Sequence, residues 1–573
     1  MKCTVYYNDT SETLTPNKMS FFEEVYFDYK TVNQNGAEKI SLFIHPKQTI
    51  QLAKITLEIS YNFTTSDKLL CNGFQSWSET KTYTINEKIP RLRSIAKPYF
   101  KYYGDEYIFD SYDRPDLFSW TYGYVQRENE FLMIASIQEQ TAFSLIEYDI
   151  PANIIRITKL CDNIELNHSF PAMDIMVDKG AEHKVFDNYF KALGSSPKEL
   201  KPTFGYTSWY RHYNKITEEK ILRDLKSFSD HTNIEPFNQS DRIFQIDDGY
   251  QSEIGDWITS NDSFPKGMNS IAKQITDRGL VPGIWIAPFV CSKNSKIFNQ
   301  HQTWLLKDKN GKPLRAGYNP LWGGWYFALD IYNPQVKEYL TEVCFTIFNK
   351  WSFQLVKADF LFAACIAPPI DKTRGQVMHD AMTFLDQLVG QHRLLACGVP
   401  LGSTFHHAHY CRIGPDTHLA WDHSLLRFLR KRERVSTISA LRTIIHRRHL
   451  SYHVFINDPD VFIMRATGHQ LNAAQQYTIL LVQILFGHQI FNSDDWSSYN
   501  TGTIDEIKGL LSFRQAHILS CAEPHPDYYQ VSFKTSILFT AHINLSKKKV
   551  PLTHPVSDGY LAPFESLVLK NQE

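Results

Sequence analysis

The chain has 573 residues, enough for three or four domains of about 150 residues each, or for fewer if one is a large barrel. Hydrophobic residues make up 43% and charged residues 21%, which is typical of a globular protein with a sizeable core. Lys plus Arg (60) and Asp plus Glu (61) leave a formal net charge of -1. This balance excludes a broad basic surface for nucleic acid or for an anionic membrane.

The nine cysteines are scattered and include no CxxC pair, so the sequence predicts neither a disulfide framework nor a zinc knuckle. The first segment, MKCTVYYNDTSETL, lacks the apolar stretch of a secretory signal. The most apolar helical stretch, 477–491, contains Gln483 and His488 and is too short to cross a bilayer. We therefore expect a cytoplasmic protein that binds neither membranes nor nucleic acid.

Residues 1–195 are predicted to form a β-domain. The segments 54–63, 141–150 and 153–161 alternate apolar and polar residues and are rich in β-branched and aromatic side chains. The Asn-Gly end of 33–36 predicts a hairpin between two such strands. A β-sandwich is the natural packing for many short strands.

Between residues 196 and 520, short apolar runs alternate with helical segments. Asn333 and Pro334 predict the start of one helix, and Gly279 predicts the end of another. Eight runs are predicted strands, at 204–210, 242–247, 281–289, 353–362, 393–401, 410–414, 452–458 and 484–491. Eight strands, most followed by a potential helix, indicate a (β/α)8 barrel. Residues 521–573 return to a strand pattern, which predicts a small C-terminal β-domain.

The predicted strands of the barrel end in an unusual number of carboxylates, which we expect to crowd one rim with few cations beside them. Such strand ends carry the active site in this fold. They are Asp247-Asp248, Lys357-Ala358-Asp359, Arg412 to Asp416, Asn457-Asp458-Pro459-Asp460 and Ser493-Asp494-Asp495.

Lys357 and Asp359 form one candidate catalytic pair. Because they are two residues apart on a strand, their side chains point to the same face, here the barrel interior. We expect the ammonium group to keep Asp359 ionised and nucleophilic. The alternative is a buried ion pair that only shapes the barrel.

Asp416 follows the turn Gly414-Pro415, which is expected to lift its carboxylate into the barrel mouth. A carboxylate that faces an ionised one tends to hold its proton, which suits an acid/base role. Asp359 and Asp416 could then approach to about 5 Å, the separation for double displacement with retention. The alternative is that Asp416 only forms a turn after proline.

Metal binding has two candidate sites, and we predict neither. Asp247 and Asp248 could be ligands of Mg²⁺ or Ca²⁺, but no nearby loop supplies the remaining oxygens, and paired acceptors also suit sugar hydroxyls. A zinc site would need the histidine-rich loop, but no zinc motif has its spacing. Its members are His406, His407, His409 and Cys411. No cofactor is predicted.

The segment 72–78, with the sequence NGFQSWS, stands out in the N-terminal domain. Trp77 is either part of the sandwich core or an aromatic side chain that crosses the domain interface and caps the barrel mouth.

In their order and spacing, these motifs resemble those of the melibiase-type α-galactosidases of glycoside hydrolase family 36. The segments that carry the resemblance are 72–78, FQIDDGYQ at 244–251, Lys357-Ala358-Asp359, Arg412 with Asp416, NDPD at 457–460 and SDD at 493–495. One departure is Phe74, where the family has a tryptophan. The resemblance implies an N-terminal β-supersandwich (1–195), a catalytic (β/α)8 TIM barrel (196–520) and a C-terminal antiparallel β-sandwich domain (521–573).

The resemblance also implies roles for single residues. Asp359 would be the nucleophile and Asp416 the acid/base. The substrate-binding residues would be Asp247, Asp248, Lys357, Arg412, Trp285, Trp209, Trp77, Cys397 and Gly398. In this set the paired aspartates would bind the 4- and 6-hydroxyls of galactose. Lys357 and Arg412 would bind other ring hydroxyls, and Cys397 and Gly398 would lie near the 2-hydroxyl.

The activity so implied is that of a retaining, exo-acting α-galactosidase that takes a small carbohydrate as substrate. Two sibling activities remain open: an α-N-acetylgalactosaminidase, and galactosyl transfer as in raffinose-type synthases. A different class, a non-catalytic carbohydrate-binding protein, would be expected to lack one of the two catalytic carboxylates. A homo-oligomer that associates through the N-terminal sheet is also open.

Overall fold

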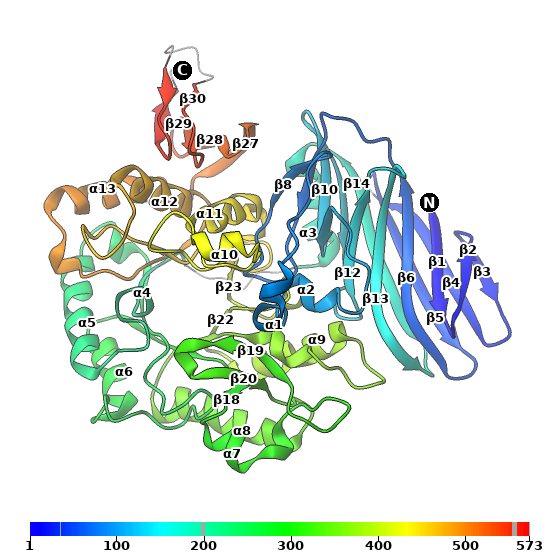
Figure 1. Ribbon diagram of the computed structural model, residues 1–573. Coiled ribbons are helices and arrows are strands. Elements are labelled where there is room, and N and C mark those ends of the chain that lie inside the picture. The colour runs from blue at the N-terminus through cyan, green and yellow to red at the C-terminus, as the bar shows by residue number, and fades with distance from the viewer. Residues whose placement is uncertain (35, 196–200, 553–558, 572–573) are drawn as a thin grey trace.

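Three parts follow one another along the chain: a two-sheet β-domain, a barrel and a small C-terminal sheet (Figure 1). In the computed structural model, the described residues are 1–34, 36–195, 201–552 and 559–571. Across these residues, no helix has both the length and the apolarity needed to cross a membrane.

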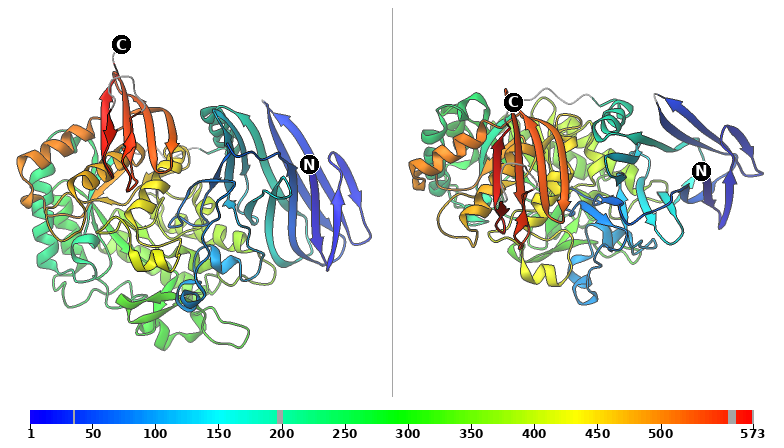
Figure 2. Two further views of the ribbon diagram at one scale, coloured as in Figure 1. Left: turned by 45° about the horizontal axis from the view of Figure 1, so that its top comes forward. Right: turned by 90° about the horizontal axis from the view of Figure 1, so that it is seen from above.

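The N-terminal part consists of two antiparallel sheets that lie against one another (Figures 1 and 2). One sheet has the order β2-β1-β6-β13-β12-β9, with β1 Lys2–Tyr7, β2 Thr10–Leu14, β6 Ile50–Ser60, β9 Phe118–Trp120, β12 Phe143–Asp149 and β13 Ile154–Leu166. The other has the order β3-β4-β5-β14-β11-β10-β7-β8, with β3 Lys18–Phe21, β4 Val25–Gln34, β5 Ala37–Pro46, β7 Lys68–Cys71, β8 Lys81–Thr84, β10 Tyr122–Arg127, β11 Glu130–Ser136 and β14 Phe170–Gly180.

The strand predictions for this part agree with the structure. The segments 54–63, 141–150 and 153–161 largely coincide with β6, β12 and β13. Strands β4 and β5 pair from Gln34 with Ala37 outward, as the predicted hairpin requires, although its turn contains residue 35, which lies outside the described residues. The alternation of apolar and polar residues was sufficient to predict these strands because each strand buries one face.

The central part is the predicted (β/α)8 barrel. Its parallel strands are β15 Thr203–Thr207, β16 Asp241–Ile246, β17 Val281–Ile286, β21 Leu355–Ala358, β22 Arg393–Ala396, β23 Tyr410–Arg412, β24 Ile456–Asp458, β25 Val461–Phe462 and β26 Gln489–Asn492. Strands β24 and β25 are two halves of the seventh strand, interrupted at Pro459 and Asp460, where the φ angle of Asp460 is 75°. Because β25 pairs with β26 and β26 pairs with β15, the barrel closes.

Helices surround this barrel (Figure 1). They are α4 Trp209–His212, α5 Glu218–Thr232, α6 Gly267–Asp277, α7 Lys296–Gln300, α8 Pro334–Phe345, α9 Arg374–Val389, α10 Ser424–Phe428, α11 Thr437–His446, α12 Ala473–Phe486 and α13 Thr501–Leu511. The predicted start of α8 is confirmed, since the Asn333 side chain accepts a hydrogen bond from the backbone N–H of Gln335. Helix α6 ends two residues before Gly279, also as predicted.

Several predicted strands are too long, and two of them overlap α-helices. Residues 208–210 leave the sheet and begin α4, and residues 484–486 are the last turn of α12 rather than the start of the eighth strand. Helix α12 is buried on nearly all sides from Thr478 onward, so its continuous apolar run has no helical period to distinguish it from a strand. No α-helix occurs in residues 397–409, between the fifth and sixth strands.

Two insertions near the barrel mouth were not predicted. A three-stranded antiparallel sheet, β18 Val290–Ser292, β19 Arg315–Asn319 and β20 Gly324–Ala328, lies between the third strand and α8. The short helices α1 Lys97–Phe100 and α2 Asp105–Ile108 belong to the N-terminal part but lie beside the barrel (Figure 1). A further helix, α3 Glu182–Leu193, precedes the barrel.

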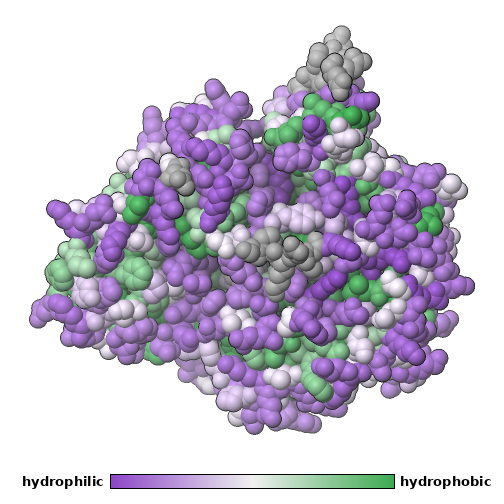
Figure 3. Space-filling view, turned by 180° about the vertical axis from the view of Figure 1, so that it is seen from behind, coloured by the Kyte–Doolittle hydropathy of each residue, from purple (hydrophilic) through white to green (hydrophobic). Residues whose placement is uncertain are grey.

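The C-terminal part is an antiparallel sheet next to α11–α13 (Figure 1). Its strands are β27 His517–His525, β28 Tyr528–Lys534, β29 Leu538–Asn544 and β32 Ser566–Lys570, with a separate pair, β30 Val550–Pro551 and β31 Tyr560–Leu561. Seen from behind, the molecule has a mostly hydrophilic surface on which hydrophobic residues form small scattered patches (Figure 3).

Candidate active site

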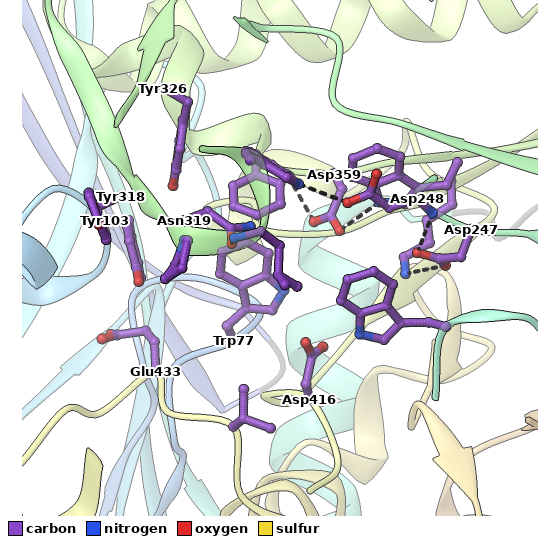
Figure 4. Close-up of a pocket in the computed structure, with 18 of the residues that line it drawn as sticks. Trp77, Tyr103, Asp247, Asp248, Tyr318, Asn319, Tyr326, Asp359, Asp416 and Glu433 are labelled. Atoms are coloured by element: carbon purple, nitrogen blue, oxygen red, sulfur yellow. Dashed lines mark hydrogen bonds and ion pairs between the residues drawn. The ribbon is translucent and has the colours of Figure 1, made fainter. Parts of the chain in front are cut away.

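A cavity of about 310 Å³ opens at the carboxyl ends of the barrel strands. Residues from both the barrel and the N-terminal part line it, and Figure 4 shows several of them. The predicted site residues among its lining are Trp77, Trp209, Asp247, Asp248, Trp285, Lys357, Asp359 and Asp416. Its size is at the small end of the range for ligand pockets, which suits a ligand of one or two sugar rings.

Asp247 and Asp248 lie at the inner end of the cavity, directly after β16. Both are 3% exposed. Asp247 Oδ2 accepts hydrogen bonds from Gln245 (2.9 Å) and Thr207 (3.2 Å). Asp248 accepts from Trp322 Nε1 (2.8 Å) and Gln251 Nε2 (2.6 Å). Burial raises the pKa of Asp248 to about 6, and these two hydrogen bonds offset part of the effect.

Lys357 and Asp359 both reach the cavity, as their spacing on β21 predicted, but the expected pairing between them is wrong. The Lys357 ammonium lies 3.0 Å from Asp247 Oδ2 and forms its ion pair there. Burial lowers the pKa of Lys357, but the charge of Asp247 more than compensates and the net shift is upward. Lys357 therefore stays charged and fixes the inner aspartate.

Asp359 is held by different donors. Trp285 Nε1 donates to its Oδ2 (3.0 Å), and the backbone N–H of Phe360 donates to its Oδ1 (2.9 Å). Burial raises the pKa of Asp359, with Lys357 and Trp285 acting in the opposite direction. The net shift is thus upward, contrary to the expectation that lysine would dominate. Phe360 adopts a left-handed conformation with φ 55°, a strained geometry of the kind found at functional sites.

Asp416 lies across the cavity from Asp359 (Figure 4). Strand β23 ends at Arg412, and the turn at Gly414 and Pro415 carries Asp416 off the strand as predicted. Its side chain is 38% exposed, whereas Asp359 is 7% exposed. Arg412 does not line the cavity; its Nη1 donates to Asp416 Oδ1 at 2.8 Å.

Arg412 is the centre of a buried charge cluster behind Asp416. Its guanidinium also contacts Asp458 (3.0 Å) and Asp460 (2.8 Å). Asp460 accepts further hydrogen bonds from the Tyr210 hydroxyl and the backbone N–H of Thr417. Burial raises the pKa of Asp460 to about 7. The cluster fixes the direction from which Asp416 enters the cavity.

The expectation that the rim carboxylates have few cations beside them is also wrong. Asp494 pairs with Arg465 at 2.7 Å, and Asp495 pairs with Arg211 at 2.8 Å. These arginines are distant in sequence from their partners, so only the fold brings them together. The two aspartates do not belong to the cavity lining.

The segment 72–78 crosses from the N-terminal part into the barrel, and Trp77 lies in the middle of the cavity (Figure 4). Trp77 Nε1 donates to Cys397 Sγ at 3.1 Å. A Cβ atom at Gly398 would stand 2.7 Å from the indole, so only glycine fits beneath the ring. Cys397 and Gly398 therefore lie behind Trp77 and do not line the cavity.

Arg447, at the end of α11, holds this segment in place. It is fully buried, and its guanidinium donates to the carbonyl oxygens of Gly73, Gln75 and Ser76 and to Asn72 Oδ1. The same Nη1 that bonds Ser76 also bonds the carbonyl of Ile413, next to Arg412 (2.9 Å each). In the part of the chain that the structure describes, no acidic side chain forms an ion pair with Arg447.

Several cavity residues escaped the sequence analysis. Trp322 comes from the unpredicted inserted sheet and donates to Asp248. The remaining ones are Phe100, Tyr103, Tyr210, Tyr318, Asn319, Pro320, Leu321, Tyr326, Phe360, Lys431, Glu433 and Val435. The turn Trp322-Gly323-Gly324 was a usable signal, since an aromatic residue before paired glycines in an insertion suggests a close approach.

The histidine-rich loop does not form a metal site. His409 Nδ1 accepts a hydrogen bond from the backbone N–H of Leu394 at 3.3 Å, and His407 lies 3.6 Å from Asp386. Over residues 1–34, 36–195, 201–552 and 559–571, no group of three or more His, Cys, Asp or Glu side chains is arranged to hold a metal ion.

The sequence pattern of the melibiase family matches residues 186–385. Residues 186–385, about a third of the chain, thus form a melibiase-like domain. The resemblance drawn from the motifs is thereby confirmed at the level of the family. The matched part of the melibiase domain includes Asp247, Asp248, Lys357 and Asp359, whereas Asp416 lies beyond it.

Curated relatives of the melibiase domain are α-galactosidases that match over short segments. The α-galactosidase AgaA of Geobacillus stearothermophilus is 29% identical over 152 residues, which are 26% of this chain and 20% of that protein. Alpha-galactosidase 1 of Pediococcus pentosaceus is 30% identical over 113 residues, 19% of this chain and 15% of that protein. The chain thus spans a fifth or less of the length of these relatives.

Solved structures are similar over nearly the whole chain, and one of them is TtGalA, an α-galactosidase from Thermus thermophilus in complex with p-nitrophenyl α-D-galactopyranoside. The TM-score is 0.70, the sequence identity is 22%, and the similarity covers 93% of this chain and 98% of that one. This similarity supports the arrangement of a barrel between β-domains around the melibiase domain.

Proposed function

We propose that the protein is a retaining, exo-acting α-galactosidase that hydrolyses terminal α-galactosyl residues by double displacement. The observation that carries the proposal is one sugar-sized cavity with Asp359 and Asp416 on opposite sides. The melibiase match and the names of the relatives support galactose as the sugar.

In the proposed reaction, Asp359 attacks the anomeric carbon while Asp416 protonates the departing oxygen. Water then releases the covalent galactosyl intermediate, with Asp416 acting as base. Asp247 and Asp248 accept hydrogen bonds from sugar hydroxyls at the closed inner end, and Lys357 keeps Asp247 in place. The aromatic rings of Trp77, Trp209 and Trp285 provide apolar faces for the pyranose ring.

Galactose is proposed over N-acetylgalactosamine because of Trp77. The family resemblance assigns the 2-substituent to the neighbourhood of Cys397 and Gly398, and the indole covers both residues. A 2-acetamido group would need that space. Turnover of an aryl α-galactoside compared with an aryl α-N-acetylgalactosaminide separates these activities, and added sugar acceptors reveal transfer.

Replacing Asp359 by alanine tests the proposal. We expect Asp359→Ala to lose nearly all turnover, because the covalent intermediate cannot form. Azide should restore part of the activity and give the β-galactosyl azide, identified by NMR. Formation of the α-azide would show that residue 359 is not the nucleophile.

A non-catalytic carbohydrate-binding protein is the competing class. Both carboxylates are present and line one cavity, which favours an enzyme. If the purified protein released no p-nitrophenol from the α-galactoside between pH 4 and 8, yet bound galactose, this second class would hold.

We also propose a cytoplasmic location. All nine cysteines lie within the described residues and are unpaired thiols, as is usual in a reducing compartment. Association of copies through the N-terminal sheet stays a prediction.

A further inference from the structure

The cavity has a second end, which the catalytic assignment leaves unused. Asp247 and Asp248 close the inner end, whereas Tyr103, Tyr318 and Glu433 gather on the other side of Trp77 (Figure 4). Because the more exposed Asp416 would protonate the departing oxygen, the leaving group must extend toward this outer end.

The segment 431–435, between α10 and α11, forms one wall of the outer end. Lys431, Glu433 and Val435 line the cavity, while the alternating residues Arg432 and Arg434 point away from it. Residues 432 and 433 form a turn, so this alternation comes from the local backbone and not from a strand.

The two arginines anchor the segment. Arg432 pairs with Asp105 of α2 and donates to the carbonyl oxygen of Cys71 at 2.9 Å. Arg434 Nε donates to Asp422 at 2.9 Å. Both arginines are largely buried, so the residues between and beside them are presented from a fixed backbone.

Glu433 offers an acceptor to the cavity. Its Oε1 accepts a hydrogen bond from Ser78 at 2.8 Å, and Gly104 packs against the carboxyl group, leaving no room for a Cβ atom. Among the residues that the structure describes, none donates a hydrogen bond to Oε2 or forms an ion pair with Glu433. Burial and the nearby Asp105 raise the pKa of Glu433 to about 7, which fits a carboxyl without a paired cation.

Two donors face the same end. Lys431 Nζ lies over the ring of Phe100 and donates to the Tyr103 hydroxyl at 2.6 Å, which leaves two of its three N–H groups for a ligand. Asn319 uses its Oδ1 to accept from the backbone N–H of Leu321, so its amide N–H₂ is available.

We propose that Glu433 and Lys431 bind the leaving group and select galactosides in which that group is a hydroxyl-rich sugar. The proposal rests on the proposed α-galactosidase function. A hydroxyl both donates and accepts, so neighbouring hydroxyls of a sugar match one carboxylate beside an ammonium and an amide. The ring of Tyr318 adds an apolar face on which a pyranose can lie.

An apolar leaving group fits this end less well. It would cover Glu433 Oε2 and the two remaining N–H groups of Lys431 without giving them partners, and each such loss is costly. An apolar leaving group would instead have to pack against the apolar side chains at this end, such as Leu321.

The test compares two substrates that share galactose and differ in the leaving group: melibiose, which releases glucose, and p-nitrophenyl α-galactoside, which releases an aryl group. At pH 8, where Glu433 is mostly ionised, we expect Glu433→Gln to raise the ratio of the melibiose KM to the aryl KM about tenfold, since a hydrogen bond to a charged group is lost for melibiose only. Glu128→Gln, the same change at an exposed glutamate of the N-terminal part, should leave the ratio at its original value.

Leu321→Ala provides the opposite comparison, because it removes apolar surface at the same end. An equal rise in both KM values for Glu433→Gln would overturn the inference, since the residue would then only shape the cavity. So would a ratio that responds to Leu321→Ala but not to Glu433→Gln, which would assign the site to an apolar leaving group. If the unmutated protein hydrolysed neither substrate, the proposed function itself would fall, and this inference with it.

Discussion

At the level of single residues, the inner end of the cavity depends on how buried charges are distributed. Asp247 has a full ion pair with Lys357, whereas Asp248 receives only neutral donors from Trp322 and Gln251. Two adjacent carboxylates are thus placed in different environments, and burial raises the pKa of Asp248 to about 6.

This difference predicts a pH dependence of sugar binding. Below pH 6 Asp248 takes up a proton and becomes a weaker acceptor for sugar hydroxyls, so the affinity for galactose should fall as the pH is lowered from 7 to 5. Isothermal titration with galactose measures the effect, which approaches tenfold per pH unit at the acid end.

Asp248→Asn is the control for this prediction. The variant should bind galactose weakly at all pH values and show a much flatter profile. An unchanged profile in Asp248→Asn would assign the titration to another group.

The sequence predicted which residues gather at the site better than it predicted their partners. Spacing on a strand correctly brought Lys357 and Asp359 to one cavity, but it could not show that Asp247, on another strand, is the nearer partner of the lysine. Pairing depends on distances between strands, which no local pattern contains.

At the level of structural elements, the segment 72–78 couples the N-terminal part to the barrel. Arg447 donates hydrogen bonds to the backbone on both sides of this contact, from Gly73 to Ile413. Because Trp77 lies on this segment and Ile413 is next to Arg412, we regard Arg447 as a positioning residue that acts through Trp77.

Replacing Arg447 by methionine tests this role. We expect Arg447→Met to raise the KM for the aryl α-galactoside at least tenfold, with a smaller change in kcat, because Trp77 loses its fixed place. If Arg447 acts through the indole, the Arg447→Met/Trp77→Ala double variant should bind no worse than Trp77→Ala alone.

If the losses of affinity caused by Arg447→Met and Trp77→Ala were additive in the double variant, the role would be contradicted, since Arg447 would then support the site independently of Trp77. Arg447→Lys is a useful comparison: one ammonium cannot satisfy all the carbonyl groups, so it should restore only part of the affinity.

Helices and strands were predictable from the sequence where each buries one face and exposes the other, and they were not predictable elsewhere. The sandwich strands and α8 carry clear periodicity, and both predictions are confirmed. Helix α12 is buried on nearly all sides, so its last turn could not be told from the start of the eighth strand. The inserted sheet β18–β20 interrupts the alternation of strands and helices and was not predicted.

On the scale of the whole molecule, Arg442 on α11 joins all three parts. Its Nε and Nη2 contact the Asp527 carboxylate at 2.6 Å each, in the C-terminal sheet, and its Nη1 donates to Glu79 of the N-terminal part at 2.9 Å. This bidentate pair is the kind of charged contact that fixes orientation as well as adding stability.

Arg442→Leu is therefore expected to lower the temperature of unfolding by about 5 °C, because it leaves Asp527 without its ion-pair partner and Glu79 with only the longer ion pair to Arg434 at 3.7 Å. Calorimetry measures the change. Arg223→Leu, at an exposed arginine of α5, should change it by less than about 1 °C. Equal shifts in the two variants would show that Arg442 does not join the parts.

The order of the three parts was predictable, because periods of strands and of strand–helix units differ along the chain. The contacts between the three parts were not predictable from the sequence. Arg447 and Asn72, which form one of these contacts, are 375 positions apart, and the local sequence around either residue does not indicate its partner.

That separation has a consequence for protein synthesis. A ribosome adding about 5–20 residues per second needs roughly 20 to 75 s to travel from codon 72 to codon 447. During this interval the N-terminal sandwich has been synthesised, but the segment 72–78 still lacks the hydrogen bonds that Arg447 donates to it. The complete pocket can therefore form only after Arg447 has been synthesised.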